Sequence, residues 1–196
     1  MRRKSIMLDT IIANWVIFAV SVFAGWQRVS AIRYKRLSEK DLFTGCFNKD
    51  WAITRKNSKL VRMMKHTDKA GVPFGLMFID FDDFKQVNDK NGHEYGDKII
   101  LKIVSVIKRK LEKKGILVRF GGDELMALIP NTHMEELREF CGNLCWVVEQ
   151  NVDHTISVGG TIFNKGDAIN VEDLINKADK NVYTAKENGK NCAIVA

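Results

Sequence analysis

Two glycines followed directly by two carboxylates, Gly121-Gly122-Asp123-Glu124, are the residues of this chain whose types and spacing best suit chemistry. Glycine lets the backbone approach a phosphate closely, and adjacent carboxylates can hold the metal ions that a phosphate requires. The same four residues could also form an ordinary hairpin turn, because glycine and aspartate are common turn residues. The run therefore indicates phosphate chemistry only when other motifs accompany it.

A second group of residues precedes this run. It consists of Asp80-Phe81-Asp82-Asp83-Phe84-Lys85-Gln86-Val87-Asn88-Asp89, followed by Gly92-His93 and Gly96-Asp97. Together with the glycine run, this order resembles the GGDEF family of diguanylate cyclases. Further matches to the family pattern are Asp41, Thr44, Gly45 and Asn48 near the start, and Ala178-Asp179, Tyr183, Ala185-Lys186 and Gly189-Lys190-Asn191 near the end. The resemblance covers residues 41–196, and five modest motifs in the right order make it specific.

The resemblance implies a two-metal site for nucleotidyl transfer. Asp80 and Asp123 would be the metal ligands, as their family counterparts are, with the Phe81 carbonyl as a further ligand. A shell of hard oxygen ligands favours Mg²⁺ or Mn²⁺. Asp123 and Glu124 would form the catalytic pair, in which Glu124 acts either as the base for the attacking 3′ hydroxyl or as a second metal contact. The sequence does not separate these two roles.

The resemblance also implies a set of GTP-binding residues. Asp97 occupies the guanine-reading position and Asn88 is its partner. A carboxylate accepts both N–H donors of the guanine edge, which adenine lacks, so GTP is favoured over ATP. Gly121 and Gly122 would let the hairpin lie against the triphosphate. The other residues expected at the nucleotide are Lys85 and His93, and Lys186 and Lys190, which share one helix face and can neutralise the β and γ phosphates.

Each of these residues also has an ordinary structural interpretation. Asp80 could simply end a strand, Asp97 could cap the helix that it begins, and the two lysines could lie on an exposed helix face. We expect Asp82, Asp83 and Asp89 to stay solvated, with support of the metal site as an alternative for Asp82. Only the joint arrangement favours the functional interpretation.

Some positions depart from the family pattern. Leu125 replaces the usual phenylalanine and shrinks a buried wedge, and Lys190 replaces an arginine, which keeps the charge but loses a bidentate contact. At the register where many members carry an Arg-x-x-Asp product-binding site, this chain has Glu112-Lys113-Lys114-Gly115. We therefore expect no feedback inhibition by product through that site. None of these changes removes a metal ligand or the catalytic carboxylate.

Apolar runs and turn residues indicate the elements that position these groups. Helices are predicted over residues 48–70, 97–113, 134–150 and 171–188, and strands over 74–81, 116–120, 125–129, 155–161 and 193–195. Strands separated by helices, with a central hairpin, predict an α+β fold with a mixed sheet and surrounding helices. This order is similar to the palm of nucleotide cyclases and polymerases, as the resemblance also implies. The end of the first strand would then lie beside the hairpin, so that Asp80 and Asp123 meet.

One N-terminal apolar helix is expected before the catalytic domain, which we assign to residues 41–196. Residues 6–26 are mainly apolar and approach the ~20 residues that cross a bilayer. We favour one spanning helix with a linker within residues 1–40, which would place the protein in the bacterial inner membrane with its catalytic domain in the cytoplasm. The alternative is an interfacial or dimerising helix.

The distribution of charge and the spacing of the cysteines argue against a nucleic-acid-binding protein and a zinc protein. The formal net charge is +7, but residues 1–40 carry eight Lys and Arg residues against two acids, so the catalytic domain is nearly neutral and is not expected to bind nucleic acid. Cys46, Cys141, Cys145 and Cys192 form no Cys-x-x-Cys pair. We interpret them as reduced, mostly buried thiols and expect no zinc site.

The sequence thus predicts a membrane-anchored diguanylate cyclase that condenses two GTP into cyclic di-GMP and two pyrophosphates. We expect a homodimer, because a symmetric product of two identical substrates requires two subunits that each present one GTP. The alternative is a catalytically silent GTP-binding signalling or interaction module with the same fold. The presence of Asp80, Asp123 and Glu124 favours the enzyme.

Overall fold

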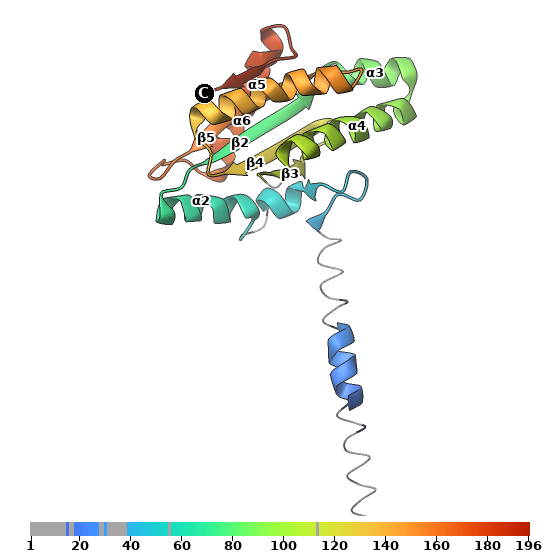
Figure 1. Ribbon diagram of the computed structural model, residues 1–196, viewed down its shortest axis with the longest axis vertical. Helices are drawn as coiled ribbons and strands as arrows, with labels where there is room; N and C mark the ends of the chain where they lie inside the picture. Colours follow the sequence, from blue (N-terminus) through green and yellow to red (C-terminus); the bar gives the residue numbers. More distant parts are fainter. Residues whose placement is uncertain (1–14, 16–17, 28–29, 31–38, 55, 113) are drawn as a thin grey trace, which may run out of the picture. The chain divides into compact units, whose positions relative to one another are not determined.

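The computed structural model describes residues 15, 18–27, 30, 39–54, 56–112 and 114–196, and the chain divides into two units, Met1–Glu39 and Lys40–Ala196. The helices and strands labelled in Figure 1 all belong to the second unit. Its elements in chain order are β1 (Phe47–Asn48), the π-helical turn η1 (Asp50–Thr54), α2 (Lys59–Ala70), β2 (Phe74–Phe81), α3 (Phe84–Asn91), α4 (His93–Leu111), β3 (Ile116–Arg119), β4 (Glu124–Pro130), α5 (Met134–Asn151), β5 (Ile156–Phe163), α6 (Val171–Glu187) and β6 (Ala193–Val195).

The strands form one mixed sheet in the order β1-β3-β4-β2-β5-β6. The β3–β4, β4–β2 and β2–β5 pairs are antiparallel, whereas the outer pairs β1–β3 and β5–β6 are parallel. The predicted mixed sheet with surrounding helices and a central β3–β4 hairpin is therefore confirmed.

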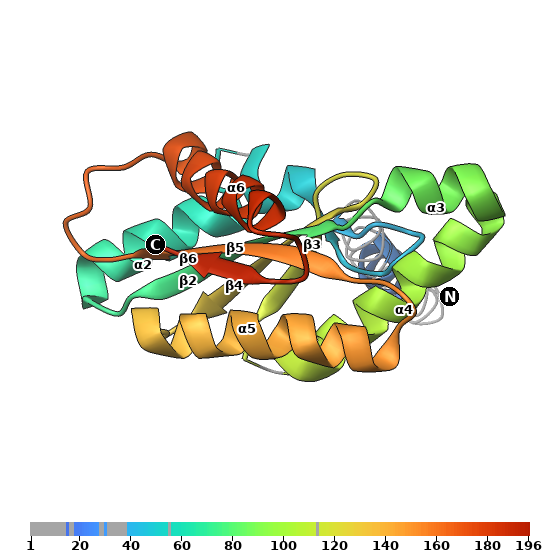
Figure 2. The ribbon, with the colours of Figure 1, turned by 90° about the horizontal axis from the view of Figure 1, so that it is seen from above.

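Helices cover both faces of this sheet, with α4 and α5 on one face and α2 and α6 on the other (Figure 2). Along β2, Met77 and Ile79 pack in the α4–α5 core and Leu76 and Phe78 in the α2–α6 core. Successive side chains of a strand point to opposite faces. A strand covered on both faces reads as a continuous apolar run, which is why residues 74–81 could be recognised from the sequence.

The structure differs from the predicted elements at three places. The predicted helix over residues 48–70 is divided, because the Ser58 hydroxyl accepts from the Val61 N–H and starts α2, while the Asn48 side chain accepts from the Trp51 N–H and caps η1. Helix α3 was not predicted. Helix α4 begins at His93, so Asp97 lies inside the helix and its interpretation as a cap is wrong.

The predicted membrane location is also wrong. Within residues 15, 18–27, 30, 39–54, 56–112 and 114–196, no helix is both long and apolar enough to cross a membrane. Residues 18–27 are helical, with Phe18, Phe23 and Trp26 more than half exposed. Residues 1–14 and 16–17, on which most of the predicted N-terminal helix falls, lie outside the described residues.

The prediction that the cysteines are mostly buried thiols is confirmed. Cys46, Cys141 and Cys145 are buried free thiols, and Cys192 is partly exposed. Burial raises the pKa of the Cys145 thiol to about 12, which keeps it protonated. These thiols therefore pack as small apolar side chains.

Gly159 sets the distance between β5 and α6. A Cβ at this position would collide with the backbone of α6 at Ala178 and Val182, which cannot move as a side chain can. We expect Gly159→Ala to lower the free energy of unfolding by about 2–3 kcal/mol, measured by urea denaturation. Gly142→Ala is the matched control, because a Cβ at Gly142 in α5 has no neighbour within 4 Å, and it should stabilise by roughly 0.5–1 kcal/mol. Equal effects of the two substitutions would contradict this account.

Candidate active site

Two carboxylates face each other across adjacent strands. Asp80, near the end of β2, is the direct cross-strand partner of Glu124, the first residue of β4. Asp80 is two residues from Phe78 on β2, and Glu124 is two residues from Met126 on β4. Because alternate side chains of a strand share a face, both carboxylates point to the α6 face, as Phe78 and Met126 do. The hairpin turn comes to the same place, since the Phe81 N–H donates to the Asp123 carbonyl at 3.3 Å. The structure thus brings Asp80, Phe81, Asp123 and Glu124 together, with Glu124 rather than Asp123 opposite Asp80.

The two glycines of the hairpin have different surroundings. A Cβ on Gly121 would collide with the Glu124 carboxylate, whereas a Cβ on Gly122 would meet no atom within 4 Å. The N–H groups of Phe120 and Gly121 both donate to the Glu124 carbonyl, at 3.0 and 3.2 Å. Gly121 therefore makes room for the carboxylate of this chain, and only Gly122 offers an open backbone to a ligand.

The carboxylates at the strand ends repel one another. Burial raises the pKa of Asp80; the ion pair with Lys186 opposes this shift, and the nearby charges of Asp123 and Asp82 add to it. Burial also raises the pKa of Glu124, with further contributions from Asp80 and Asp123. A site with this excess of negative charge attracts cations.

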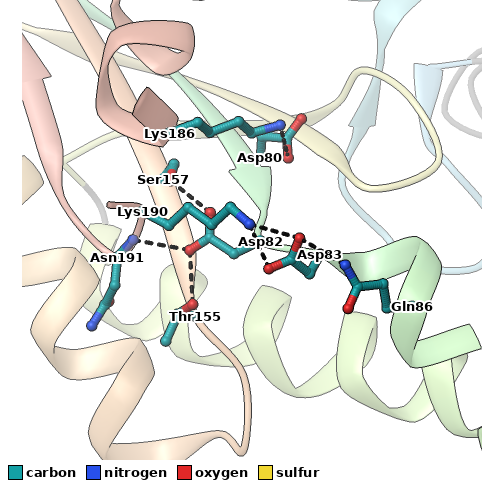
Figure 3. A network of polar contacts seen from close by, with 9 residues as sticks. All are labelled: Asp80, Asp82, Asp83, Gln86, Thr155, Ser157, Lys186, Lys190 and Asn191. Atoms are coloured by element: carbon teal, nitrogen blue, oxygen red, sulfur yellow. Dashed lines mark hydrogen bonds and ion pairs between the residues drawn. The ribbon is translucent and has the colours of Figure 1, made fainter. Parts of the chain in front are cut away.

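Two lysines supply compensating charge in this structure (Figure 3). Lys186, in the last turn of α6, lies 2.6 Å from Asp80, and Lys190 in the following turn lies 2.6 Å from Asp83. The structure thus places both lysines at the end of β2, where the sequence predicted phosphate contacts. Their present partners are carboxylates.

The predicted guanine-reading residues lie on α3 and α4. Asn88 is partly buried on α3, and its Oδ1 atom has no hydrogen-bond partner among the described residues. Gly96 packs against this atom so closely that a Cβ at residue 96 would overlap it. Asp97 follows directly and is exposed, as are His93 and Lys85. Asn88 and Asp97 therefore lie near each other where α3 and α4 pack together, while neither the side chain of Lys85 nor that of His93 has a hydrogen bond or ion pair with another described residue.

Arg119 was not assigned a role from the sequence, and Asp82 was expected to stay solvated, with support of the metal site as the alternative. The Arg119 Nε donates to the Gly121 carbonyl at 2.6 Å, and its Nη1 is buried without a hydrogen-bond partner in the described part of the chain. Burial lowers the pKa of Arg119, and nearby carboxylates, including Asp123 and Asp97, oppose that shift. Asp82 is 4% exposed, so the expectation that it stays solvated is wrong. The position of Arg119 beside the glycine run was the available signal for that residue. The burial of Asp82 had no local signal, because its partners are distant in the sequence.

Two pockets flank the strand ends. One of about 530 Å³ is lined by Lys49, Phe120, Glu124 and Asp179, among others. Another of about 590 Å³ borders Asp83, Lys190 and the loop before β5. Glu124 thus borders one hollow of the surface, and Asp82 and Asp83 border the other.

The donor set suits a metal ion that is shared with a substrate. No group of three or more His, Cys, Asp or Glu side chains is gathered tightly enough to hold an ion by itself within the described ranges. Mg²⁺ is usually held by one or two carboxylates together with substrate phosphates. Asp80 and Asp123, whose charges repel in this structure, fit that requirement.

The raised pKa of Glu124 predicts a pH-dependent gain in stability when the charge is removed. A carboxyl whose pKa is higher in the folded than in the unfolded chain contributes stability that is present at acid pH and lost as pH rises through the folded pKa. We expect Glu124→Gln to raise the midpoint of thermal unfolding at pH 7 by about 1–2 °C, a discounted figure for a partly exposed group. Calorimetry near pH 4, at about the ordinary pKa of glutamate, should show a smaller difference. A lower midpoint at pH 7 would contradict the inferred repulsion.

Comparison with known proteins adds independent information. The family described as "Diguanylate cyclase, GGDEF domain" matches residues 39–192. The uncharacterized protein YtrP of Bacillus subtilis is 34% identical over 118 residues, which cover 59% of this chain and 20% of YtrP. The probable diguanylate cyclase DgcT of Escherichia coli is 28% identical over 191 residues, which cover 92% of this chain and 39% of DgcT. The chain therefore spans about a fifth to two fifths of the length of these relatives.

Solved structures agree with the fold. The crystal structure of the coiled coil and GGDEF domain of DgcB from Caulobacter crescentus, in complex with c-di-GMP, has a TM-score of 0.79 and 23% sequence identity to this chain. It covers 92% of this chain and 97% of the DgcB chain. At this identity the likeness concerns the fold alone, whereas the family match extends over most of the sequence. The chain belongs to the GGDEF family of diguanylate cyclases.

Proposed function

We propose that this chain condenses two GTP molecules into cyclic di-GMP with release of two pyrophosphates. The observation that carries the proposal is the pairing of Asp80 with Glu124 across β2 and β4, with Asp123 in the adjoining turn and Lys186 on Asp80. Membership of the family and the name of the relative DgcT, a probable diguanylate cyclase, support it. So does the c-di-GMP in the structure of DgcB.

Metal binding falls to the residues at the strand ends. Asp80, Asp123 and the Phe81 carbonyl would hold Mg²⁺ or Mn²⁺ in a two-metal site. When bound, the metal ions neutralise phosphate charge and lower the pKa of the attacking hydroxyl. Lys186 would leave Asp80 for the phosphates, since one carboxylate oxygen cannot serve both partners equally well.

Glu124 takes the role of base in this proposal. Its raised pKa suits a group that accepts a proton, because a base is most effective when its pKa approaches the working pH. It would accept the proton of the 3′ hydroxyl as that oxygen bonds to the α phosphorus and the bond to pyrophosphate breaks. A metal contact by Glu124 is the remaining alternative.

Guanine recognition rests on Asn88 and Asp97. The Oδ1 atom of Asn88 is a buried acceptor without a partner in the described structure, and such an atom costs free energy until a donor reaches it. The N1–H and amino group of guanine supply donors, and the exposed Asp97 carboxylate can accept the second. Adenine lacks this donor pair, so selectivity for GTP follows.

The phosphates would meet the cationic groups around the hairpin. Lys186, Lys190 and the buried Nη1 of Arg119 offer donors. The open backbone at Gly122 lets the triphosphate approach the turn. Lys85 and His93 remain candidates for outer contacts.

A homodimer forms part of this proposal. Each catalytic domain would present one GTP, so the symmetric product requires two domains to face each other. Residues 1–40 would bring the two domains, residues 41–196, together. The exposed apolar side chains of Phe18, Phe23 and Trp26 on the helical segment 18–27 support a pairing role for this unit.

The test is synthesis by the purified full chain. The unaltered chain, incubated with GTP and Mg²⁺ or Mn²⁺, should form cyclic di-GMP and pyrophosphate, and Glu124→Gln should lower the rate at least ~10²-fold. Glu139→Gln in α5 is the matched control, because Glu139 is exposed and borders Pro130 and Asn131, at the opposite end of β4 from Glu124. A folded dimer that binds GTP and forms no dinucleotide would favour the silent module.

Gly96→Ala tests guanine binding separately from catalysis. The added Cβ would displace the amide of Asn88, so we expect the KM for GTP to rise about tenfold while kcat changes little, as for loss of one good hydrogen bond in binding. Steady-state kinetics measures both constants, and Gly142→Ala serves as the control. An unchanged KM would remove Asn88 from the binding site.

A further inference from the structure

Asp82 links three segments that are distant in the sequence (Figure 3). Its carboxylate accepts from the Thr155 hydroxyl at 2.7 Å, from the Ser157 hydroxyl at 2.6 Å and from the Asn191 N–H at 3.0 Å. Thr155 directly precedes β5, Ser157 is its second residue, and Asn191 lies in the turn after α6. The side chain is 4% exposed. These hydrogen bonds hold the three segments together, because separating them would leave each buried donor without a partner.

The acids on either side of Asp82 hold the same segment at its surface. Asp80 pairs with Lys186, and Asp83 pairs with Lys190. The lysine side chains are 37% and 39% exposed, whereas their partners Asp80 and Asp83 are 16% and 45% exposed, so the Asp83 pair is open to water and water reaches the Asp80 pair from the side of the lysine. Exposed ion pairs contribute little to stability and exchange readily. The stretch 80–83 therefore holds the stretch 186–191 at three points, of which the central one, at Asp82, is the most deeply buried.

The turn that carries Lys190 adopts a backbone that needs support. Gly189, Lys190 and Asn191 have φ values of 104°, 65° and 47°. Non-glycine residues rarely adopt positive φ and do so where the surrounding structure holds them. The bond from the Asn191 N–H to Asp82 supplies such a hold at the end of this turn.

We propose that Asp82 is a positioning residue that keeps Lys186 and Lys190 at the end of β2 when their ion pairs with Asp80 and Asp83 open to receive the triphosphate. This inference rests on the proposed function, in which metal takes Asp80 and phosphates take the lysines. Both ion pairs are then lost, and the buried hydrogen bonds to Asp82 remain. Asp82 itself touches neither the phosphates nor the reacting atoms.

The first test needs no nucleotide. In the full chain without ligand, Asp82→Ala should speed amide hydrogen exchange at residues 189–192 and leave Ile103, in the core of α4, unchanged. Asp153→Asn is the matched control, because Asp153 is an exposed acid two residues before Thr155. Unaltered exchange at residues 189–192 in Asp82→Ala would overturn the proposal.

The second test separates positioning from a general loss of structure. Affinities for GTP and GMP are measured by calorimetry for the unaltered chain and for Asp82→Ala. GMP shares the guanine contacts but lacks the β and γ phosphates, so we expect GTP affinity to fall about tenfold and GMP affinity to stay unchanged. Replacing both lysines with methionine should abolish this difference between Asp82→Ala and its parent. Equal losses for GTP and GMP would show a merely structural role and overturn the proposal.

A milder variant covers the case in which Asp82→Ala does not fold. Thr155→Val removes one hydroxyl from Asp82 with little change of shape. It should lower GTP affinity about threefold with unchanged GMP affinity, and equal effects on both ligands would again overturn the proposal.

If the unaltered chain binds GTP but forms no cyclic di-GMP, the proposed function fails, while the two affinities still decide the role of Asp82. If it binds GTP no more tightly than GMP, the lysines do not hold phosphates and the proposal on Asp82 is overturned.

Discussion

The antiparallel register between β2 and β4 is the constraint on which the rest of the site depends. It places Asp80 opposite Glu124 and points both toward α6, the helix that carries Lys186. A slip of one residue would turn one of the two carboxylates to the other face of the sheet. Both faces are covered by helices, so the same slip would also move Met77 and Phe78 into the wrong cores. Packing of the apolar residues thus fixes the geometry of the charged ones.

Charge at the strand ends and stability of the fold act against each other. Burial and mutual repulsion raise the pKa values of Asp80 and Glu124, which means that the ionised forms are held at a cost in folding free energy. Lys186 offsets part of this cost in the ligand-free chain. A divalent cation would offset more, because it carries twice the charge. In the proposed metal site, the remaining repulsion would favour the binding of cations, and the apolar packing of both cores would hold the carboxylates in place.

The sequence predicted those features that depend on local pattern. The continuous apolar run at residues 74–81 indicates a buried strand, and the apolar runs on both sides of Gly121–Glu124 indicate the hairpin. It did not predict α3, whose residues are mostly polar, or the start of α4 at His93, where Gly92 with a φ of 82° separates the two helices. The burial of Asp82 was also missed. Its partners lie 73 to 109 residues away, and no local pattern reports contacts of that range.

The lysine at position 190 can be understood from its present partner. Both carboxylate oxygens of Asp83 lie within 2.7 Å of the single Lys190 ammonium. A guanidinium in this place would meet the two oxygens with two separate N–H groups and would be harder to release. Lysine thus gives up bidentate recognition of a phosphate, yet it also leaves Asp83 more easily. In the proposed function these two effects on nucleotide binding oppose each other, so the departure from arginine at this position would weaken the site less than the loss of one bidentate contact alone would imply.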